Sequence, residues 1–209
     1  VVSSFFRDTV KLDKIDGYFG NTLRGFVKGF QPFADQGIRP FTGASSILKS
    51  DAIVLLGANP QEEAPVSASY IRVSTIIERA KLVNISRDKN PFDGITDTDV
   101  RAQSPEEIEK LLLSVREALE KGEEDLPGEA GEIVRILRGA ERPIFVIGSA
   151  VAEYPQLVAE AVNLAVASKA FFDDGLGVVP MLRGGNCLGG LNTVIGDSDW
   201  LSGNDLDFL

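Results

Sequence analysis

Two glycine-containing stretches carry the residues that could take part in binding chemistry, and the first follows a short apolar run. Residues 53–56 are Ile-Val-Leu-Leu, and Gly57, Asn59 and Pro60 come directly after them. Glycine lacks a Cβ, so backbone N–H groups around it can approach a diphosphate closely, with help from the dipole of a following helix. The same residues also suit a tight turn, in which Asn59 forms an Asx turn instead of reading a nucleotide base. The stretch is not G-x-G-x-x-G, and no G-x-x-x-x-G-K-[ST] occurs, so both interpretations stay open.

The second stretch, residues 183–190, reads Arg-Gly-Gly-Asn-Cys-Leu-Gly-Gly. Its glycines around Asn186 could hold a loop against a bulky cofactor or could form a surface loop. Cys187 is the only thiol of the chain, and the sequence has no histidine to activate it. We therefore interpret Cys187 as a small buried or half-buried residue.

The residue types that are missing narrow the chemistry further. Without histidine there is no Ser-His-Asp or Cys-His machinery and none of the usual zinc ligand sets. One cysteine excludes a disulfide within the chain and an iron–sulfur cluster bound by this segment alone. The carboxylate clusters, among them Glu62-Glu63, are interpreted as solvated faces or helix caps. We predict neither catalytic residues nor metal ligands in this chain.

Composition and charge limit the partners. The chain has 209 residues and a net charge of −10, which disfavours nucleic acid and anionic membrane as direct partners because both require clustered Lys and Arg. No apolar run reaches the roughly 18–20 residues that span a bilayer, so we expect no direct membrane insertion. The sequence begins at Val1 and its only methionine is Met181, which favours a piece of a longer protein.

The elements that must position these residues follow from hydrophobic periodicity. Short apolar runs predict buried parallel strands at residues 51–57, 81–85 and 143–148. Helices are predicted from Pro65 to about Ala80, after the capping box Ser104–Glu107 to Gly122, in a shorter segment that ends at Gly139, and over residues 155–168. In the first helix, Val66, Ile71, Ser74, Ile77, Tyr70, Val73, Ile76 and Ala80 are predicted to form a broad apolar inner face.

The predicted fold class is α/β, a doubly wound and mostly parallel sheet with flanking helices, Rossmann-like in type. A strand, a glycine and a proline-opened helix occur twice, at Gly57 with Pro65 and at Gly148 with Pro155. Two similar halves of this kind place a ligand crevice at the carboxyl ends of the strands. We expect residues 1–42 to be an irregular segment, the tail of a preceding domain. Residues 43–209 would form the α/β domain, in halves of about 43–100 and 101–196.

The segment from Ser50 to Val66 closely resembles the "aspartate–apolar strand–G-x-N-P-x-x-E-A-P" segment of the large iron–sulfur subunit of NADH:quinone oxidoreductase, respiratory complex I. Ile71-Arg72 fits the continuation of that motif. Residues 142–149 look like the family's "K/R-P-x-x-x-x-G-S" strand, and residues 182–189 look like its "L-R-x-G-N-x-x-G" loop. The resemblance covers about residues 44–196.

That family resembles molybdopterin-dependent formate dehydrogenases and nitrate reductases in fold. The resemblance implies that Gly57, Asn59 and Pro60 occupy the turn that contacts the guanosine diphosphate end of a pterin dinucleotide, and Asn186 the later loop. Residues 85–88, Ile-Ser-Arg-Asp, depart from the Asp-Pro-Arg type of sequence usual in molybdenum enzymes. This departure and the Glu62-Glu63-Ala64 stretch favour the complex I branch, in which the domain holds no molybdenum cofactor. In that branch the cofactor-binding positions Gly57, Asn59, Pro60 and Asn186 would be vestigial.

We therefore expect a scaffold fragment of the peripheral-arm electron-transfer subunit, without a redox centre of its own. Its parent would carry iron–sulfur clusters upstream, and its partners would be other peripheral-arm subunits on the cytoplasmic or matrix side of the membrane. The alternative is a molybdopterin-dinucleotide-binding domain of a formate-dehydrogenase-like oxidoreductase, with molybdopterin guanine dinucleotide as cofactor. A free-standing Rossmann-type nucleotide binder is a third interpretation.

Overall fold

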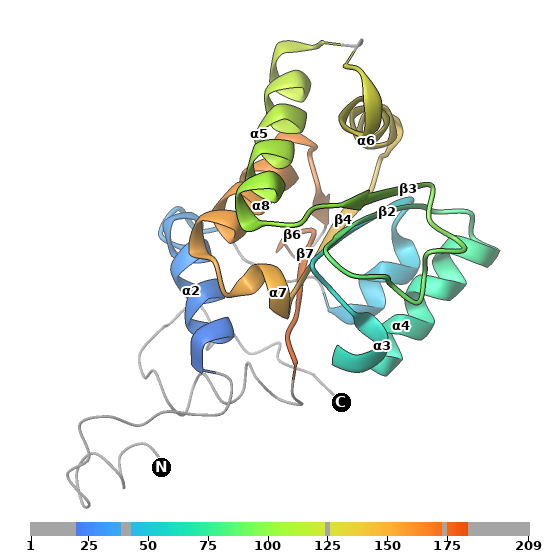
Figure 1. Cartoon of the computed structure of the whole chain (residues 1–209), viewed down its shortest axis with the longest axis horizontal. Coiled ribbons are helices and arrows are strands. Elements are labelled where there is room, and N and C mark those ends of the chain that lie inside the picture. The colour runs from blue at the N-terminus through green and yellow to red at the C-terminus, as the bar shows by residue number, and fades with distance from the viewer. Residues whose placement is uncertain (1–19, 39–42, 124–125, 173–174, 184–209) are drawn as a thin grey trace, which may run out of the picture.

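The strands of the main sheet are all parallel, in a computed structural model that describes residues 20–38, 43–123, 126–172 and 175–183. Their order is β3-β2-β1-β4-β7 (Figure 1). The bounds of these strands are β1 Ala52–Leu56, β2 Lys81–Ser86, β3 Thr98–Arg101, β4 Pro143–Gly148 and β7 Val178–Met181. A short antiparallel pair, β5 Phe171–Phe172 and β6 Gly175–Leu176, lies beside it. The predicted parallel α/β fold is confirmed.

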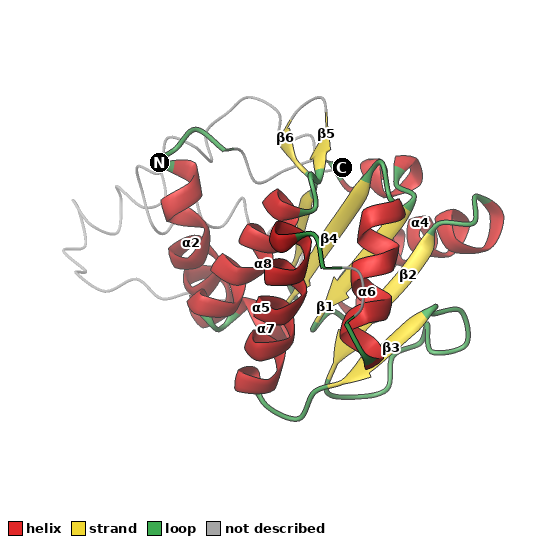
Figure 2. Ribbon diagram, turned by 90° about the horizontal axis from the view of Figure 1, so that it is seen from above, coloured by secondary structure: helices red, strands yellow, loops and turns green. Residues whose placement is uncertain are grey.

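Helices cover both faces of this sheet, as Figure 2 shows from above. The predicted helices are present as α4 Pro65–Arg72, α5 Pro105–Lys121, α6 Gly128–Gly139 and α8 Pro155–Ala167. The capping box works as predicted, because the Ser104 hydroxyl accepts a hydrogen bond from the Glu107 amide. Gly122 ends α5 in the left-handed conformation, with φ +73°. Short helical segments that were not predicted are η2 Ala44–Lys49, α3 Pro60–Glu63 and α7 Ser149–Ala152.

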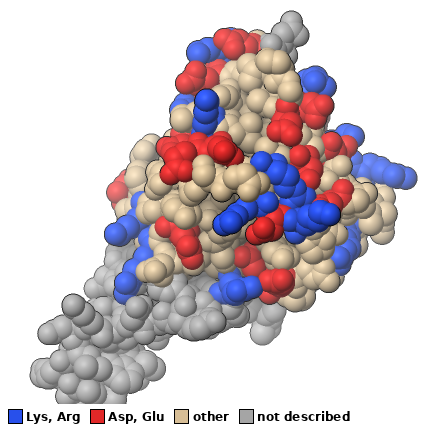
Figure 3. Space-filling view, in the orientation of Figure 1, with Lys and Arg blue, Asp and Glu red and all other residues tan. Residues whose placement is uncertain are grey.

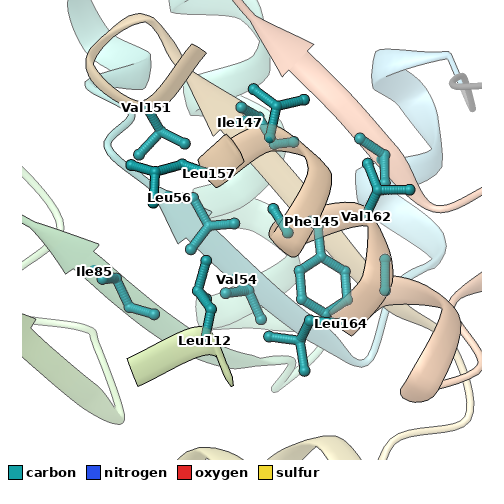
Figure 4. Packing of buried hydrophobic residues seen from close by; sticks show 14 of the residues in the cluster. Val54, Leu56, Ile85, Leu112, Phe145, Ile147, Val151, Leu157, Val162 and Leu164 are labelled. Atoms are coloured by element: carbon teal, nitrogen blue, oxygen red, sulfur yellow. The ribbon is translucent and has the colours of Figure 1, made fainter. Parts of the chain in front are cut away.

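The core consists of two apolar layers separated by the sheet. Successive side chains of a strand point to opposite faces, so Val54 and Leu56 of β1 join one layer while Ile53 and Leu55 join the other. The first layer is larger and packs against α5, α6 and α8 (Figure 4). The second layer packs against η2 and α4. Burial on both faces explains why these strands are continuously apolar in sequence.

The N-terminal region contains a helix that the sequence analysis did not predict. Residues 20–34 were expected to be irregular, but they form α2 Gly20–Ala34, which packs along α8 (Figure 1). Phe26 and Phe30 are completely buried in the larger core layer. A Cβ on Gly29 would lie 2.4 Å from the Pro155 carbonyl oxygen, so the glycines let the two backbones approach closely. Gly25 and Gly29 therefore form part of the contact surface of a packed helix.

The apolar face predicted for the helix after Pro65 is only partly correct. Ile71 is completely buried, but Val66 and Ile77 are each about two-thirds exposed, at 65% and 66%. The helix becomes a π-helix, η3 Val73–Ile77, and this extra residue per turn shifts the side chains that follow. Ser74 and Ala80 are buried as predicted, and so are the small residues Ser67 and Ala68, which were not assigned to this face.

One carboxylate joins the amino-terminal ends of β1 and β4. Asp51 precedes β1, and its two oxygens accept hydrogen bonds from the amides of Glu141 at 2.7 Å and Arg142 at 2.9 Å. These amides lie just before β4. The aspartate that begins the first motif therefore sets the register of two adjacent strands.

At their carboxyl ends β1 and β4 approach each other more closely than side chains allow. A Cβ on Gly148 would lie 2.2 Å from the Ala58 Cα and 2.4 Å from the Gly57 carbonyl oxygen. The chain runs from β1 outward to β2 and β3 on one side, and through β4 to β7 on the other. Ligands of open α/β sheets bind at such a reversal of strand order. No helix among the described residues is long and apolar enough to cross a membrane.

The packing of α2 predicts a large effect of Phe30→Ala on stability. Removing this fully buried ring would lower the free energy of unfolding by about 3–5 kcal/mol. Phe171→Ala is the matched control, because that ring is 53% exposed and its loss should change stability by about 0.5 kcal/mol or less. Urea unfolding followed by circular dichroism measures both, and equal effects would contradict the packing of α2.

The close approach of β1 and β4 predicts that Gly148→Ala is destabilising by about 1–3 kcal/mol, because the methyl group meets backbone atoms that cannot rotate away. Gly94→Ala is the control, since a Cβ there has no neighbour within 4 Å. In the same unfolding measurement the control should stay within about 0.5 kcal/mol of the wild type. A Gly148→Ala protein as stable as the control would mean that the strands separate easily.

Candidate functional site

A cavity of about 500 Å³ lies at the carboxyl ends of the central strands. It is lined by residues that follow β1, β2, β4 and β7, at the reversal of strand order: Gly57, Ala58, Asn59, Glu62, Glu63, Ser86, Arg87, Asp88, Lys89, Asn90, Ser149, Ala150 and Arg183, with Thr22 and Glu153 at its border. Cavities of this size commonly take small molecules. The crevice predicted from the two strand–glycine units is present at this place.

Gly57 occupies the turn after β1 in the left-handed conformation, with φ +57°. Its N–H donates to the Ile85 carbonyl oxygen at 2.8 Å, and its carbonyl accepts from the Ala150 amide at 3.3 Å. A Cβ here would lie 2.7 Å from the Val151 Cγ2. The glycine is therefore required for tight packing between the turn after β1 and α7, and its N–H is not directed at the cavity.

Glu63 supplies the central interaction of the site. One carboxylate oxygen accepts from the Asn59 amide at 2.9 Å, and the other accepts from the Ser149 amide at 3.0 Å. The first amide belongs to the turn after β1 and the second to the turn after β4. The carboxylate thus bridges the two turns where an external anion would be expected to bind. Glu63 was expected to be a solvated or capping residue, and it is a half-buried cap shared by two turns.

The surroundings of Glu63 raise the pKa of its carboxyl group above the ordinary glutamate value. Burial is the largest cause, since it disfavours the charged form. The hydrogen bonds from Ser149 and Asn59 and the positive charge of Arg183 act in the opposite direction and offset part of this effect. The carboxylate is therefore held by donors but incompletely solvated.

A buried polar network forms the wall of the cavity on the β2 side. The Asn84 side chain, completely buried, donates to Asp99 at 2.7 Å and to the Ser86 hydroxyl at 3.0 Å. Asn90 lies above it and donates to the Ala58 carbonyl at 2.9 Å, which ties the loop after β2 to the turn after β1. Arg101 closes the network through ion pairs with Asp93 and Asp99. Satisfied networks of this kind give a wall a single arrangement.

Charged residues of both signs surround the opening. Arg183 forms an ion pair with Glu62 at 2.7 Å, and its amide donates to the Ser149 hydroxyl at 2.7 Å. Arg87 and Lys89 are the basic side chains on the β2 side, with Asp88 between them. Figure 3 shows acidic and basic side chains interspersed over one face of the protein, with no continuous basic surface.

Only some of the predicted site residues are found at the cavity. Gly57 and Asn59 line the cavity, whereas Pro60 is buried at the first position of α3 and does not line it. Asn59 makes no side-chain cap, so the predicted Asx turn is absent, and its Oδ1 is buried without a hydrogen-bond partner among the described residues. Asn186 and Cys187 lie outside the described residues, so their predicted roles stay predictions.

The sequence alone does not identify Glu63, Ser149, Asn90 and Arg183 as parts of one site. Glu63 lies in the E-A-P part of the first motif and Ser149 at the end of the G-S strand, so both were named as motif positions only. Their pairing depends on β1 and β4 being adjacent, which the two repeated units alone do not specify. Asn90 carries no motif at all, and only its contact with Ala58 identifies it.

The turn after β1 does not fit the diphosphate that the resemblance assigns to it. The Gly57 amide is bonded to Ile85, and the amides of Asn59 and Ser149 are bonded to Glu63. A diphosphate here would find these three donors engaged and a carboxylate about 3 Å from two of them. Among the described residues, no group of three or more His, Cys, Asp or Glu side chains could hold a metal ion.

Comparison with known proteins agrees with this architecture. No curated protein matches the chain. A solved chain from the formyltransferase/hydrolase complex of Methylorubrum extorquens, determined with methylofuran, is similar in fold, with a TM-score of 0.58 and 16% sequence identity. The alignment covers 91% of this chain and 53% of that one, so this chain spans about half its length. The sequence profile for molybdopterin oxidoreductase matches residues 19–195, and because this match spans most of the chain, the protein belongs to the molybdopterin oxidoreductase family.

Proposed function

We propose that this chain is a structural domain of the peripheral-arm electron-transfer subunit of an NADH:quinone oxidoreductase, and that it holds no redox centre of its own. The observation that carries the proposal is the bridge between the Glu63 carboxylate and the amides of Asn59 and Ser149. Glu63 is the glutamate of the E-A-P segment through which the chain resembles the complex I subunit. A residue of the stretch that favours this branch thus engages two of the amides at the crevice.

In this role the chain provides a rigid body beside a cluster-bearing region. Its strands β1 and β4 are completely buried, and hydrogen bonds within the domain join the turn after β1 to the loop after β2 and to the turn after β4. Iron–sulfur clusters would reside upstream in the parent protein. Other peripheral-arm subunits would be its partners, on the cytoplasmic or matrix side of the membrane, with attachment to the membrane through those subunits.

A second candidate is a molybdopterin-dinucleotide-binding domain of a formate-dehydrogenase-like oxidoreductase. A cavity of about 500 Å³ with Arg87 and Lys89 on its border favours this function, as does the buried Asn59 Oδ1 that has no partner among the described residues. This candidate requires the Glu63 side chain to leave its two amides when the cofactor enters. It also requires a cysteine or selenocysteine ligand elsewhere in the parent gene.

Metal content of the full-length parent separates the two candidates. Purified from its native membranes and analysed by inductively coupled plasma mass spectrometry, it should contain iron but no stoichiometric molybdenum or tungsten. Cross-linking of the same preparation should join this chain to other subunits of an active NADH:quinone oxidoreductase. Stoichiometric molybdenum or tungsten would replace the proposal by the second candidate.

A further inference from the structure

Glu63 does more than cap a short helix, because of where its carboxylate lies. Its two oxygens are 2.9 Å and 3.0 Å from amides that belong to different strand–turn units. These units lie on either side of the reversal of strand order, the position at which open α/β sheets bind ligands. An internal anion therefore stands at the point where the amides of the two turns converge.

We propose that Glu63 is the residue that excludes phosphate-bearing cofactors from this crevice, because its carboxylate already holds the amides of Asn59 and Ser149. The inference deepens the proposed function, since it rests on a crevice without a dinucleotide and names the residue responsible. Two physical effects act together. The carboxylate engages the donors that a phosphate would need, and its negative charge repels a second anion at a separation of about 3 Å.

Glu62 carries the same charge beside the crevice but takes no part in the bridge. Its side chain is 58% exposed and forms an ion pair with Arg183, outside the bridge between the two turns. Glu62 and Glu63 are adjacent and chemically identical, and replacing either changes the net charge equally. Glu62 is therefore a matched control for the effect of charge alone.

The test measures binding of guanosine diphosphate by the whole chain, using nuclear magnetic resonance titration of the backbone amides. The wild type should bind it weakly or not at all. Glu63→Ser removes the carboxylate and shortens the side chain, so affinity should rise by about tenfold or more, with the Asn59 and Ser149 amides among the shifted signals. Glu62→Ser removes an equal charge and releases Arg183 but leaves the bridge in place, so its gain should stay at about threefold or less, and the Asn59 and Ser149 amide signals should not be among those most shifted.

Glu63→Gln keeps the inference testable if Glu63→Ser fails to fold. The amide retains the size of the side chain but carries no charge and offers a single acceptor oxygen, so one turn amide is released. Its affinity should also exceed that of Glu62→Ser and of the wild type. Wild-type binding as tight as that of the folded Glu63 variant, or an equal gain in Glu62→Ser, would overturn the inference.

The result is separable from the proposed function. Failure of the Glu63 variants to gain affinity would reject Glu63 as the excluding residue, while the metal content and partners of the parent could still support the structural role. Stoichiometric molybdenum in the parent would reject the structural role, whatever the variants of this chain bind.

A pH titration of the same amides gives an independent readout of the bridge. Because the pKa of Glu63 is raised, the Asn59 and Ser149 amide shifts should titrate together, with a midpoint above the ordinary glutamate value. The charged groups around it are Glu62, Glu153, Arg183, Arg87, Asp88 and Lys89. The contribution of Glu63 to stability is present below the ordinary pKa and is lost as pH rises through the raised pKa. Glu63→Gln should abolish this shared titration, and its persistence in that variant would assign it to another group.

Discussion

The contact between the carboxyl ends of β1 and β4 is the constraint on which the site depends. Gly148 has no room for a Cβ, because Ala58 and Gly57 backbone atoms occupy that space. Only at this separation can one side chain reach the amides of both turns, and Glu63 does so with its two oxygens. The buried apolar layers on either side of the sheet hold the strands in this arrangement, and the Asn84–Asn90 network fixes the neighbouring loop.

Much of the fold could be predicted from the sequence because its signals are local. Continuous apolar runs identified β1, β2 and β4, and the capping box and Gly122 placed both ends of α5. β3 was missed because Thr98–Arg101, at the sheet edge, contains a single apolar residue, Val100, and therefore lacks a continuous apolar run. α2 was missed because glycines such as Gly25 and Gly29 disfavour a helix, and their role in close packing against the Ala152–Glu153 backbone and α8 depends on segments far along the chain.

The inner face of the helix after Pro65 was predicted only in part, for a different reason. Its apolar residues are frequent enough to suggest an inner face, but the π-helical turn at Val73–Ile77 breaks the regular periodicity on which the prediction relied. The site was predictable only in part for a related reason. Gly57 and Asn59 belong to one local motif, whereas the partnership of Glu63 with Ser149 spans 86 positions and depends on strand order.

The Asp51 carboxylate, which joins the amino-terminal ends of β1 and β4, also has a consequence for folding during synthesis. Its amide partner at Arg142 lies 91 positions later in the chain. β1 therefore leaves the ribosome well before its neighbour on that side exists, with one edge open. Contacts of this sequence separation slow folding, and unpaired parallel edges expose the nascent chain to aggregation. The β1–α4–β2 unit must wait in a partly formed state until β4 arrives, and β7, which pairs with β4, can complete the sheet only after that.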